Sequence, residues 1–344
     1  MMFKSFGFQL KCSSSFRFGF LILSVAFLTG SCASHPVQEA EEPLPQVTFP
    51  KAASVAGAAY NLIQKEGLTL IELSTRDANG RELVGVTVAP EAGSNIVSIR
   101  YRGTEVLEQP TSLKDVYKQD AGIEFLYPTP NRVRNAELKY KDLHLKFQPN
   151  LGEHFIHGLA REFAWRWREP FFVGNTVIYK TWLNVTEGSE FHKKFPIKNR
   201  IELTLILEGE QLLFDFKVDN LDSKPLPFGV GVHPYFKLNG TRAQSSVQLK
   251  VSSLMDAVDQ LPSGKIIPLK ETKFAKLPTG MKVQDVLGAD DVFWPTLPGG
   301  NALVKEPDFQ FEIASSKDFG HTVLWVPPTR ELFAVENQTA STDA

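Results

Sequence analysis

Apolar and polar side chains alternate with a period of two along much of this chain. The alternation recurs at residues 177–185, 201–208, 212–219, 247–251 and 309–313. Successive side chains of a β-strand point to opposite faces of its sheet, so each stretch predicts a strand with one face in a core. The glycine break at 209, between the second and third stretches, predicts a hairpin.

The rest of the pattern favours an all-β fold. Strands do not alternate with helices along the chain, which argues against a parallel α/β fold. One alanine-rich stretch, residues 52–64, predicts a single short helix. The chain has 26 Phe and only 4 Met, and phenylalanine favours half-buried pleated surfaces. We therefore predict one large antiparallel β-sandwich domain over residues 56–344.

The first 33 residues have the pattern of a secretory signal. Basic residues precede an apolar run at 18–28, and small residues follow the run. The run is shorter than a transmembrane helix needs. We predict that residues 1–33 direct export, and that residues 34–55, rich in Glu, Pro and Ala, form a flexible linker.

Cys32 ends the stretch Leu28-Thr29-Gly30-Ser31-Cys32, which resembles a bacterial lipobox. The leucine lies one position further from the cysteine than is usual, and ordinary cleavage after Ala33 is the alternative. The lipobox interpretation predicts a lipid on Cys32. The protein would then be exported, either periplasmic or anchored to the membrane.

Charge and cysteine content exclude several functional classes. The net charge is -2 and the pI ≈ 6.4, so the chain offers no basic field to attract nucleic acid. Both cysteines, Cys12 and Cys32, lie in the predicted signal, so the domain has no disulfide, thiolate metal site or thiol nucleophile. His154 and His157 have no third ligand nearby in the sequence. We predict no metal and no other cofactor.

Of the histidines, His233 has the most informative neighbours. It follows the Gly-rich apolar sequence Phe228-Gly229-Val230-Gly231-Val232 and precedes Pro234-Tyr235-Phe236. An imidazole titrates near neutral pH, so it gives or takes a proton readily. The glycines permit close backbone approach, and the aromatic rings offer faces on which a sugar can pack. Taken alone, a buried core histidine is the commoner explanation.

Other polar residues stand beside turns or aromatic side chains. An arginine fork suits paired oxygens, and a carboxylate at an apolar strand has a raised pKa when it is desolvated. Each of these residues, taken alone, is compatible with a purely structural role. They are Asn131 and Arg132 after two prolines, His157 in His-Gly-x-x-Arg, Asp290 and Asp291 before Val-Phe-Trp, and Glu336 after Phe-Ala-Val.

In their order, these segments resemble the galactose mutarotase (aldose 1-epimerase) family. The shared pattern is Pro-Asn-Arg, His-Gly-x-x-Arg, His-Pro-Tyr-Phe, Asp-x-x-Phe and a late Glu before x-Gln-Thr, from about Leu70 to Thr339. The resemblance implies a large antiparallel β-supersandwich with its site in a cleft on one sheet. It also implies that His233 is the general acid and Glu336 the general base.

The resemblance assigns substrate binding to Arg132, His157 and Asp290. Asp291 stands where many members have histidine, which leaves the choice between the two aspartates open. Asn337 follows the late glutamate where proline is common.

The implied chemistry suits these residue types. Interconverting sugar anomers requires removal of a proton from the C1 hydroxyl and delivery of one to the ring oxygen, so one acid and one base suffice. A Glu336 carboxylate and a His233 imidazolium would form such a pair, acting on a small-molecule sugar. We expect the two side chains to face one cleft and to straddle a pyranose ring.

Three alternatives remain at the level of sequence. A glycosidase would use two carboxylates, such as Asp290 and Glu336, but it leaves His233 without a role. A hexose-phosphate 1-epimerase would need several phosphate-facing cations, for which Arg132, Arg134 and Arg161 are available. A non-catalytic carbohydrate-binding lipoprotein would use the same fold.

Overall fold

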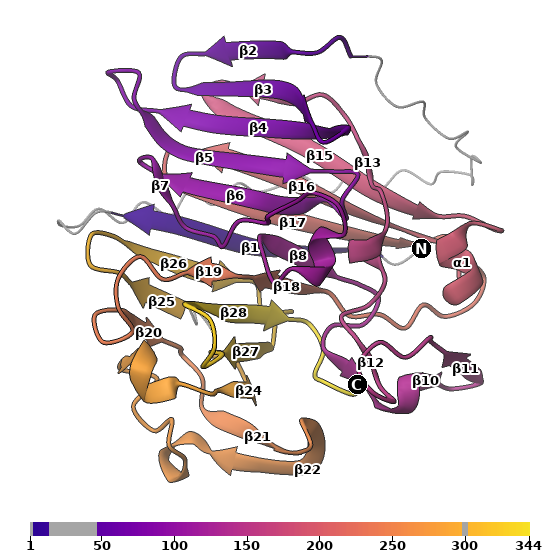
Figure 1. Cartoon of the computed structure of the whole chain (residues 1–344). Coiled ribbons are helices and arrows are strands. Elements are labelled where there is room, and N and C mark those ends of the chain that lie inside the picture. The colour runs from indigo at the N-terminus through magenta and orange to yellow at the C-terminus, as the bar shows by residue number, and fades with distance from the viewer. Residues whose placement is uncertain (1–2, 14–46, 298–301) are drawn as a thin grey trace.

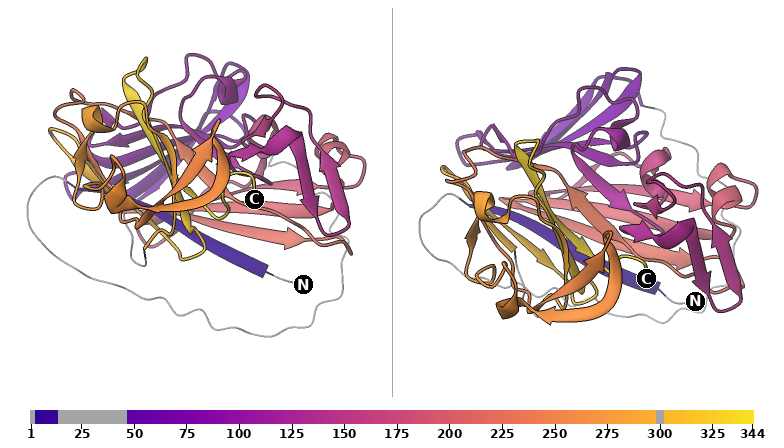
Figure 2. Two further views of the ribbon diagram at one scale, coloured as in Figure 1. Left: turned by 90° about the horizontal axis from the view of Figure 1, so that it is seen from below. Right: turned by 60° about the horizontal axis from the view of Figure 1, so that its bottom comes forward.

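The computed structural model describes residues 3–13, 47–297 and 302–344. In these residues the chain forms two large sheets, and every ladder between named strands is antiparallel. Strands β3 and β4 of one sheet lie over β15 and β16 of the other (Figures 1 and 2). The predicted antiparallel β-supersandwich is therefore confirmed.

We call the larger sheet, of 14 strands, the cleft sheet. Two short strands lie off its main path: β7 (Thr104–Glu105) pairs with β6, and β19 (Phe236–Lys237) pairs with β28. The order along the path is β2 (Lys51–Val55), β3 (Ala58–Lys65), β4 (Leu68–Arg76), β5 (Glu82–Ala89), β6 (Asn95–Tyr101), β8 (Ile123–Leu126), β18 (Gly231–Pro234), β28 (Leu332–Gln338), β27 (His321–Trp325), β24 (Asp290–Phe293), β21 (Ser253–Val258) and β22 (Leu261–Pro268).

The second sheet, of 10 strands, is called the back sheet. Its order is β13 (Arg166–Trp167), β15 (Thr176–Val185), β16 (Asn199–Glu208), β17 (Gln211–Asn220), β1 (Phe3–Ser13), β26 (Gln310–Ser315), β25 (Ala302–Lys305), β20 (Ser246–Gln248) and β23 (Met281–Lys282), with β14 (Phe171–Val173) on β15.

The remaining elements are short. Two small ladders join β10 (Glu137–Tyr140) to β11 (Leu143–Lys146), and β9 (Arg132–Val133) to β12 (Phe155–Ile156). The helices are α1 (Glu190–Lys194) and the 3₁₀ turns η1 (Val116–Lys118), η2 (Arg134–Ala136), η3 (Ala160–Glu162), η4 (Leu269–Glu271) and η5 (Val283–Val286). Among the residues that the structure describes, no helix is long and apolar enough to cross a membrane.

The core lies between the two sheets, where the alternating side chains meet. Along β16 the apolar residues at 201, 203, 205 and 207 are fully buried, as the period of two predicted. Phe125 of the cleft sheet packs against Phe214 and Phe216 of the back sheet, with ring centroids 6.2 and 5.6 Å apart. Burying one such ring contributes roughly 1.5–3 kcal/mol. The cleft sheet is therefore fixed from behind, directly under the strand that carries Glu124.

The helix predicted at 52–64 is wrong, because these residues form the hairpin of β2 and β3. Gly57, with φ +83°, makes the turn. Ala58, Tyr60 and Leu62 face the core on alternate positions, so packing overrides the helical preference of alanine. Since β2 pairs with β3, the last residues of the predicted linker at 34–55 belong to the cleft sheet.

The predicted signal falls partly outside the described residues. The apolar run at 18–28 and Cys32 both lie there. The segment before them forms β1, which pairs with β17 on one side and β26 on the other. A chain cleaved before Cys32 would lack this strand of the back sheet.

Candidate active site

Three neighbouring strands of the cleft sheet place His233 between two glutamates. On one side, His233 of β18 pairs directly with Glu124 of β8. On the other side, Val232 pairs with Asn337 of β28, so the next step of that register brings His233 beside Glu336. Directly paired residues point to the same face of a sheet. We call Glu124, His233 and Glu336 the cross-strand row.

His233 and Glu336 are in direct contact. Nε2 of His233 lies 3.3 Å from Oε1 of Glu336, and their side chains are 6% and 3% exposed. The other carboxylate oxygen, Oε2, accepts a hydrogen bond from Nε2 of Gln338 at 2.9 Å. The expectation that the pair straddles a pyranose ring is therefore wrong. A pyranose ring bound here would have to present one edge to both groups.

The pair lies at the bottom of a cavity of about 580 Å³. All five residues predicted for the site line this cavity, although they come from positions spread over some two hundred residues of sequence. They are joined by residues from the neighbouring loops. The lining residues are Tyr117, Lys118, Asp120, Asn131, Arg132, Asn150, Leu151, Ile156, His157, Arg161, Glu162, His233, Tyr235, Asp290, Trp325 and Glu336.

Burial shifts the pKa values of Glu336 and His233 in opposite directions. Burial, with a smaller contribution from Asp290, raises the pKa of Glu336 to about 8. Burial, together with the nearby charge of Arg161, lowers the pKa of His233 to about 3. At pH 7 the pair therefore holds one proton, on the carboxyl group, and the imidazole is neutral.

Arg132 and Asp290 form an ion pair on the cleft wall. Nη2 of the arginine lies 3.1 Å from Oδ2 of the aspartate, and its Nη1 donates to Oδ1 of Asn131 at 3.1 Å. Arg132 also contacts Gln260. Asp291 is not among the lining residues, because adjacent residues of β24 point to opposite faces. The structure thus places Asp290, and not Asp291, at the cleft.

His157 is held by an unusual backbone conformation. Its φ is +67°, and its backbone N–H donates to the carbonyl of Asn131, itself at φ +55°, at 3.0 Å. The next residue, Gly158, has no room for a side chain, since a Cβ there would lie 2.4 Å from the carbonyl oxygen of Tyr127. Left-handed non-glycine residues are strained and gather at functional sites. Burial lowers the pKa of His157 well below its usual range, so the ring is a neutral hydrogen-bonding group.

Aromatic rings enclose His233. Tyr235 stacks on the imidazole with centroids 4.3 Å apart, and the rings of Trp325 and His157 meet it edge-on at 6.3 and 5.1 Å. Sequence reasoning gave a packing role to the aromatic pair after His233, which includes Tyr235, and it did not single out Trp325. Flat rings beside a polar pair suit the apolar face and polar edge of a sugar.

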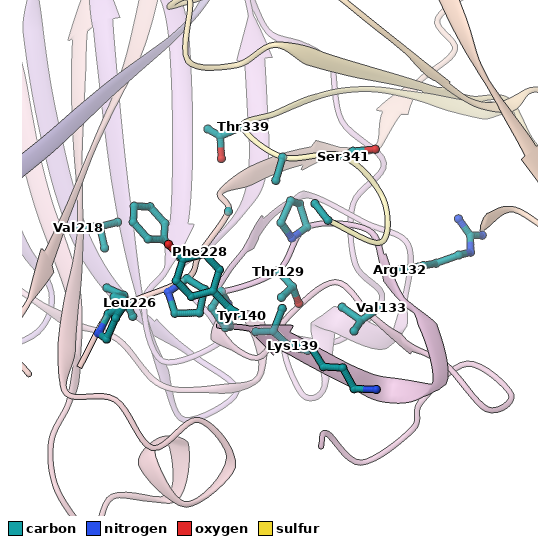
Figure 3. Close-up of a pocket in the computed structure, with 18 of the residues that line it drawn as sticks. Thr129, Arg132, Val133, Lys139, Tyr140, Val218, Leu226, Phe228, Thr339 and Ser341 are labelled. Carbon is teal, nitrogen blue, oxygen red and sulfur yellow. The ribbon is translucent and has the colours of Figure 1, made fainter. Parts of the chain in front are cut away.

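A second cavity, of about 620 Å³, also borders Arg132. It is largely apolar, with Leu226, Phe228 and Tyr140 on its wall, and the side chain of Arg132 points away from them (Figure 3). Of the five predicted site residues, only Arg132 borders it. Within the described residues, no group of three or more His, Cys, Asp and Glu could hold a metal ion.

Comparison with known proteins gives a consistent picture. A galactose mutarotase-like protein from Clostridium acetobutylicum superposes with a TM-score of 0.73 at 18% identity, over 83% of this chain and 90% of that chain. A galactose 1-epimerase from Lactobacillus acidophilus NCFM superposes with a TM-score of 0.62 at 16% identity, over 86% of this chain and 92% of that chain. These likenesses show the fold. The sequence pattern of the aldose 1-epimerase family matches residues 81–342, and the chain belongs to that family.

Proposed function

We propose that this protein is an aldose 1-epimerase that interconverts the α and β anomers of a free aldose. The observation that carries the proposal is the contact of His233 with Glu336 at 3.3 Å in a cavity large enough for a sugar. The C1 hydroxyl oxygen and the ring oxygen are bonded to the same carbon. An acid and a base that serve both atoms must therefore lie close together, as these two do.

The shared proton supports a complete cycle. The group that holds the proton gives it to the ring oxygen, while its partner takes the proton of the C1 hydroxyl. The C1–O5 bond breaks, the C1–C2 bond of the open-chain aldehyde rotates, and the reverse transfers close the ring. Before any transfer the proton is on Glu336, because its pKa is raised to about 8. Transfer across the 3.3 Å contact gives the carboxylate and imidazolium that the family resemblance implies.

The charges on the wall favour a neutral sugar over a sugar phosphate. A phosphate needs cations that are not already neutralised. Each arginine or lysine that lines the cleft has a carboxylate partner: Arg132 with Asp290 at 3.1 Å, Arg161 with Glu124 at 2.8 Å, and Lys118 with Asp115 at 3.3 Å. Since each of these cations is paired with a carboxylate, the cleft suits a neutral sugar better than a sugar phosphate.

Polarimetry tests the proposal. Freshly dissolved α-glucose or α-galactose should reach its equilibrium rotation faster with the protein than in matched buffer. Glucose 6-phosphate serves as the charged competitor and should respond less. Binding of these sugars without faster equilibration would contradict the proposal and support a non-catalytic carbohydrate-binding protein.

The activity should depend on pH through the shared proton. Above about pH 8 the pair loses its only proton, because that is where the Glu336 carboxyl ionises, and no acid remains. At lower pH the one-proton form persists down to the pKa of His233, at about 3. We expect kcat/KM to be flat from pH 5 to 7 and to fall tenfold per pH unit well above 8. A profile that rises through pH 8 would contradict this.

We also propose that the protein is exported and carries a lipid on Cys32. The support is the basic, apolar and small-residue pattern of residues 1–33. Labelled palmitate should be incorporated into the wild-type protein, and Cys32→Ala should lose both the label and membrane association. Equal membrane association of the two forms would contradict the lipid anchor.

A further inference from the structure

The first member of the cross-strand row, Glu124, has no part in the mechanism above. Its side chain is fully buried on the cleft side of β8, directly paired with His233. Buried glutamate is rare unless it has a partner. Here the partner is Arg161 of η3, whose Nη1 lies 2.8 Å from Oε2 of Glu124. The other oxygen of Glu124, Oε1, is buried and has no hydrogen-bond partner in the described residues.

Arg161 connects this buried carboxylate with the cleft. Its Nη1 also donates to the backbone carbonyl of Tyr117 at 3.2 Å, and its guanidinium lies over the Tyr117 ring. The side chain is 11% exposed and lines the cavity. Within the described residues Nε and Nη2 make no hydrogen bond. The guanidinium is thus anchored by Nη1, and Nη2 keeps its donors for a ligand.

An ion pair at this depth is poorly explained by stability alone. Removing two charges from water is unfavourable, and a buried pair is often no more stabilising than apolar residues of the same volume. The Glu124 carboxylate of this ion pair lies one strand from His233 and two strands from Glu336. Neighbouring strands are about 4.8 Å apart, so a unit charge on Glu124 shifts the pKa values of His233 and Glu336.

We propose that Glu124 is a positioning residue: it holds the Arg161 guanidinium in the cleft wall to bind a sugar hydroxyl, and it cancels the positive charge of Arg161 at the His233–Glu336 pair. The inference rests on the proposed epimerase function. It adds Arg161 to the substrate-binding residues and gives the Glu124 carboxylate the task of keeping the shared proton in place near pH 8, where the pair would otherwise lose it.

The signs of the electrostatic effects agree with this assignment. The negative charge of Glu124 is among the groups that raise the pKa of Glu336, and Arg161 lowers that of His233. Burial raises the pKa of Glu124 itself to about 7, so it is ionised where the activity is expected to fall. The charged or titratable groups around the pair are Glu124 on β8, Arg132 on β9, His157 after β12, Arg161 on η3, Tyr235 after β18 and Asp290 on β24, and the cavity is also lined by Tyr117, Lys118, Asp120 and Glu162.

Charge-neutral substitutions separate this role from a structural one. In Glu124→Gln, Arg161 keeps its charge without a counter-ion. The His233–Glu336 pair should therefore release its proton more easily. The alkaline fall of kcat/KM should move to lower pH by about half a unit or more. In Glu124→Gln/Arg161→Gln both charges are absent, and the fall should return to its wild-type position. A structural defect would not be reversed by a second substitution.

Binding is measured in the same variants. Arg161→Gln should raise KM about tenfold, the loss expected for a hydrogen bond from a charged donor. Its alkaline fall should stay near the wild-type pH, because Glu124, left without a partner, takes up a proton. Glu124→Asp keeps the charge but shortens the side chain. KM should therefore rise, while the alkaline fall of kcat/KM stays at its wild-type pH. This variant keeps the test available if Glu124→Gln does not fold.

Glu82→Gln is the matched control. Glu82 pairs with Arg100 at 3.0 Å on β5 and β6, away from the cleft. The substitution also leaves an arginine without its carboxylate, yet the pH profile and KM should be unchanged. If Glu124→Gln and Glu124→Asp fold and behave like this control, the positioning role is overturned while the epimerase function stands. If the wild-type protein does not accelerate anomer exchange, the proposed function itself fails.

Discussion

Glu336→Gln should lower the turnover number for anomer exchange roughly a hundred- to ten-thousand-fold, the usual contribution of a positioned proton-transfer group. The carboxyl group is the one that holds the shared proton at neutral pH, since burial raises its pKa to about 8. A glutamine has nearly the same shape but cannot donate or accept that proton. Polarimetry of a freshly dissolved α-sugar at pH 7 gives the rate.

The fold should survive this change. Gln338 donates to Glu336 at 2.9 Å, and an amide oxygen at residue 336 accepts the same bond. The neutral amide also avoids ionisation at a buried position, so the thermal midpoint should be equal to or above that of the wild type at pH 8. A Glu336→Gln protein that retains more than a tenth of the wild-type turnover would remove this residue from the mechanism.

His233→Asn should reduce turnover by a similar factor, again about a hundred- to ten-thousand-fold. The imidazole is the only other proton-transfer group within contact of the Glu336 carboxyl among the described residues. Because the two groups act as a unit on one proton, their effects should not add. The double variant should be about as slow as either single variant.

Single and double variants are compared in one assay with a circular dichroism control. If the double variant loses the product of the two single losses, the residues act independently, and the shared-proton mechanism is wrong. Wild-type KM in either single variant would show that sugar binding depends on the surrounding residues, such as Arg132 and Asp290.

The sequence predicted the strands well where apolar and polar side chains alternate clearly and only one face of the strand is buried. The strand at 199–208 follows directly from its buried residues at 201, 203, 205 and 207. It failed at 52–64, where alanine favours a helix in isolation but the alternate residues 58, 60 and 62 pack into the core. Local propensity is weak compared with burial, and burial depends on partners far along the chain.

The members of the candidate site were available from the sequence, but their arrangement was not. His233 and Glu336 are about a hundred residues apart, and their contact depends on the register between β18 and β28. Strand register is fixed by the whole sheet, so one sequence does not reveal it. The same limit hid Glu124, an ordinary glutamate in its own segment until β8 pairs it with His233.

The left-handed conformations of Asn131 and His157, tied by a hydrogen bond of 3.0 Å, bear on the entropy of sugar binding. These strained torsions are set when the protein folds, and the core beneath the loops maintains them. Under the proposed function, a sugar therefore meets hydroxyl-binding groups that are already preorganised and need little further ordering. The same preorganised groups would receive either anomer, which suits the proposed exchange between the two.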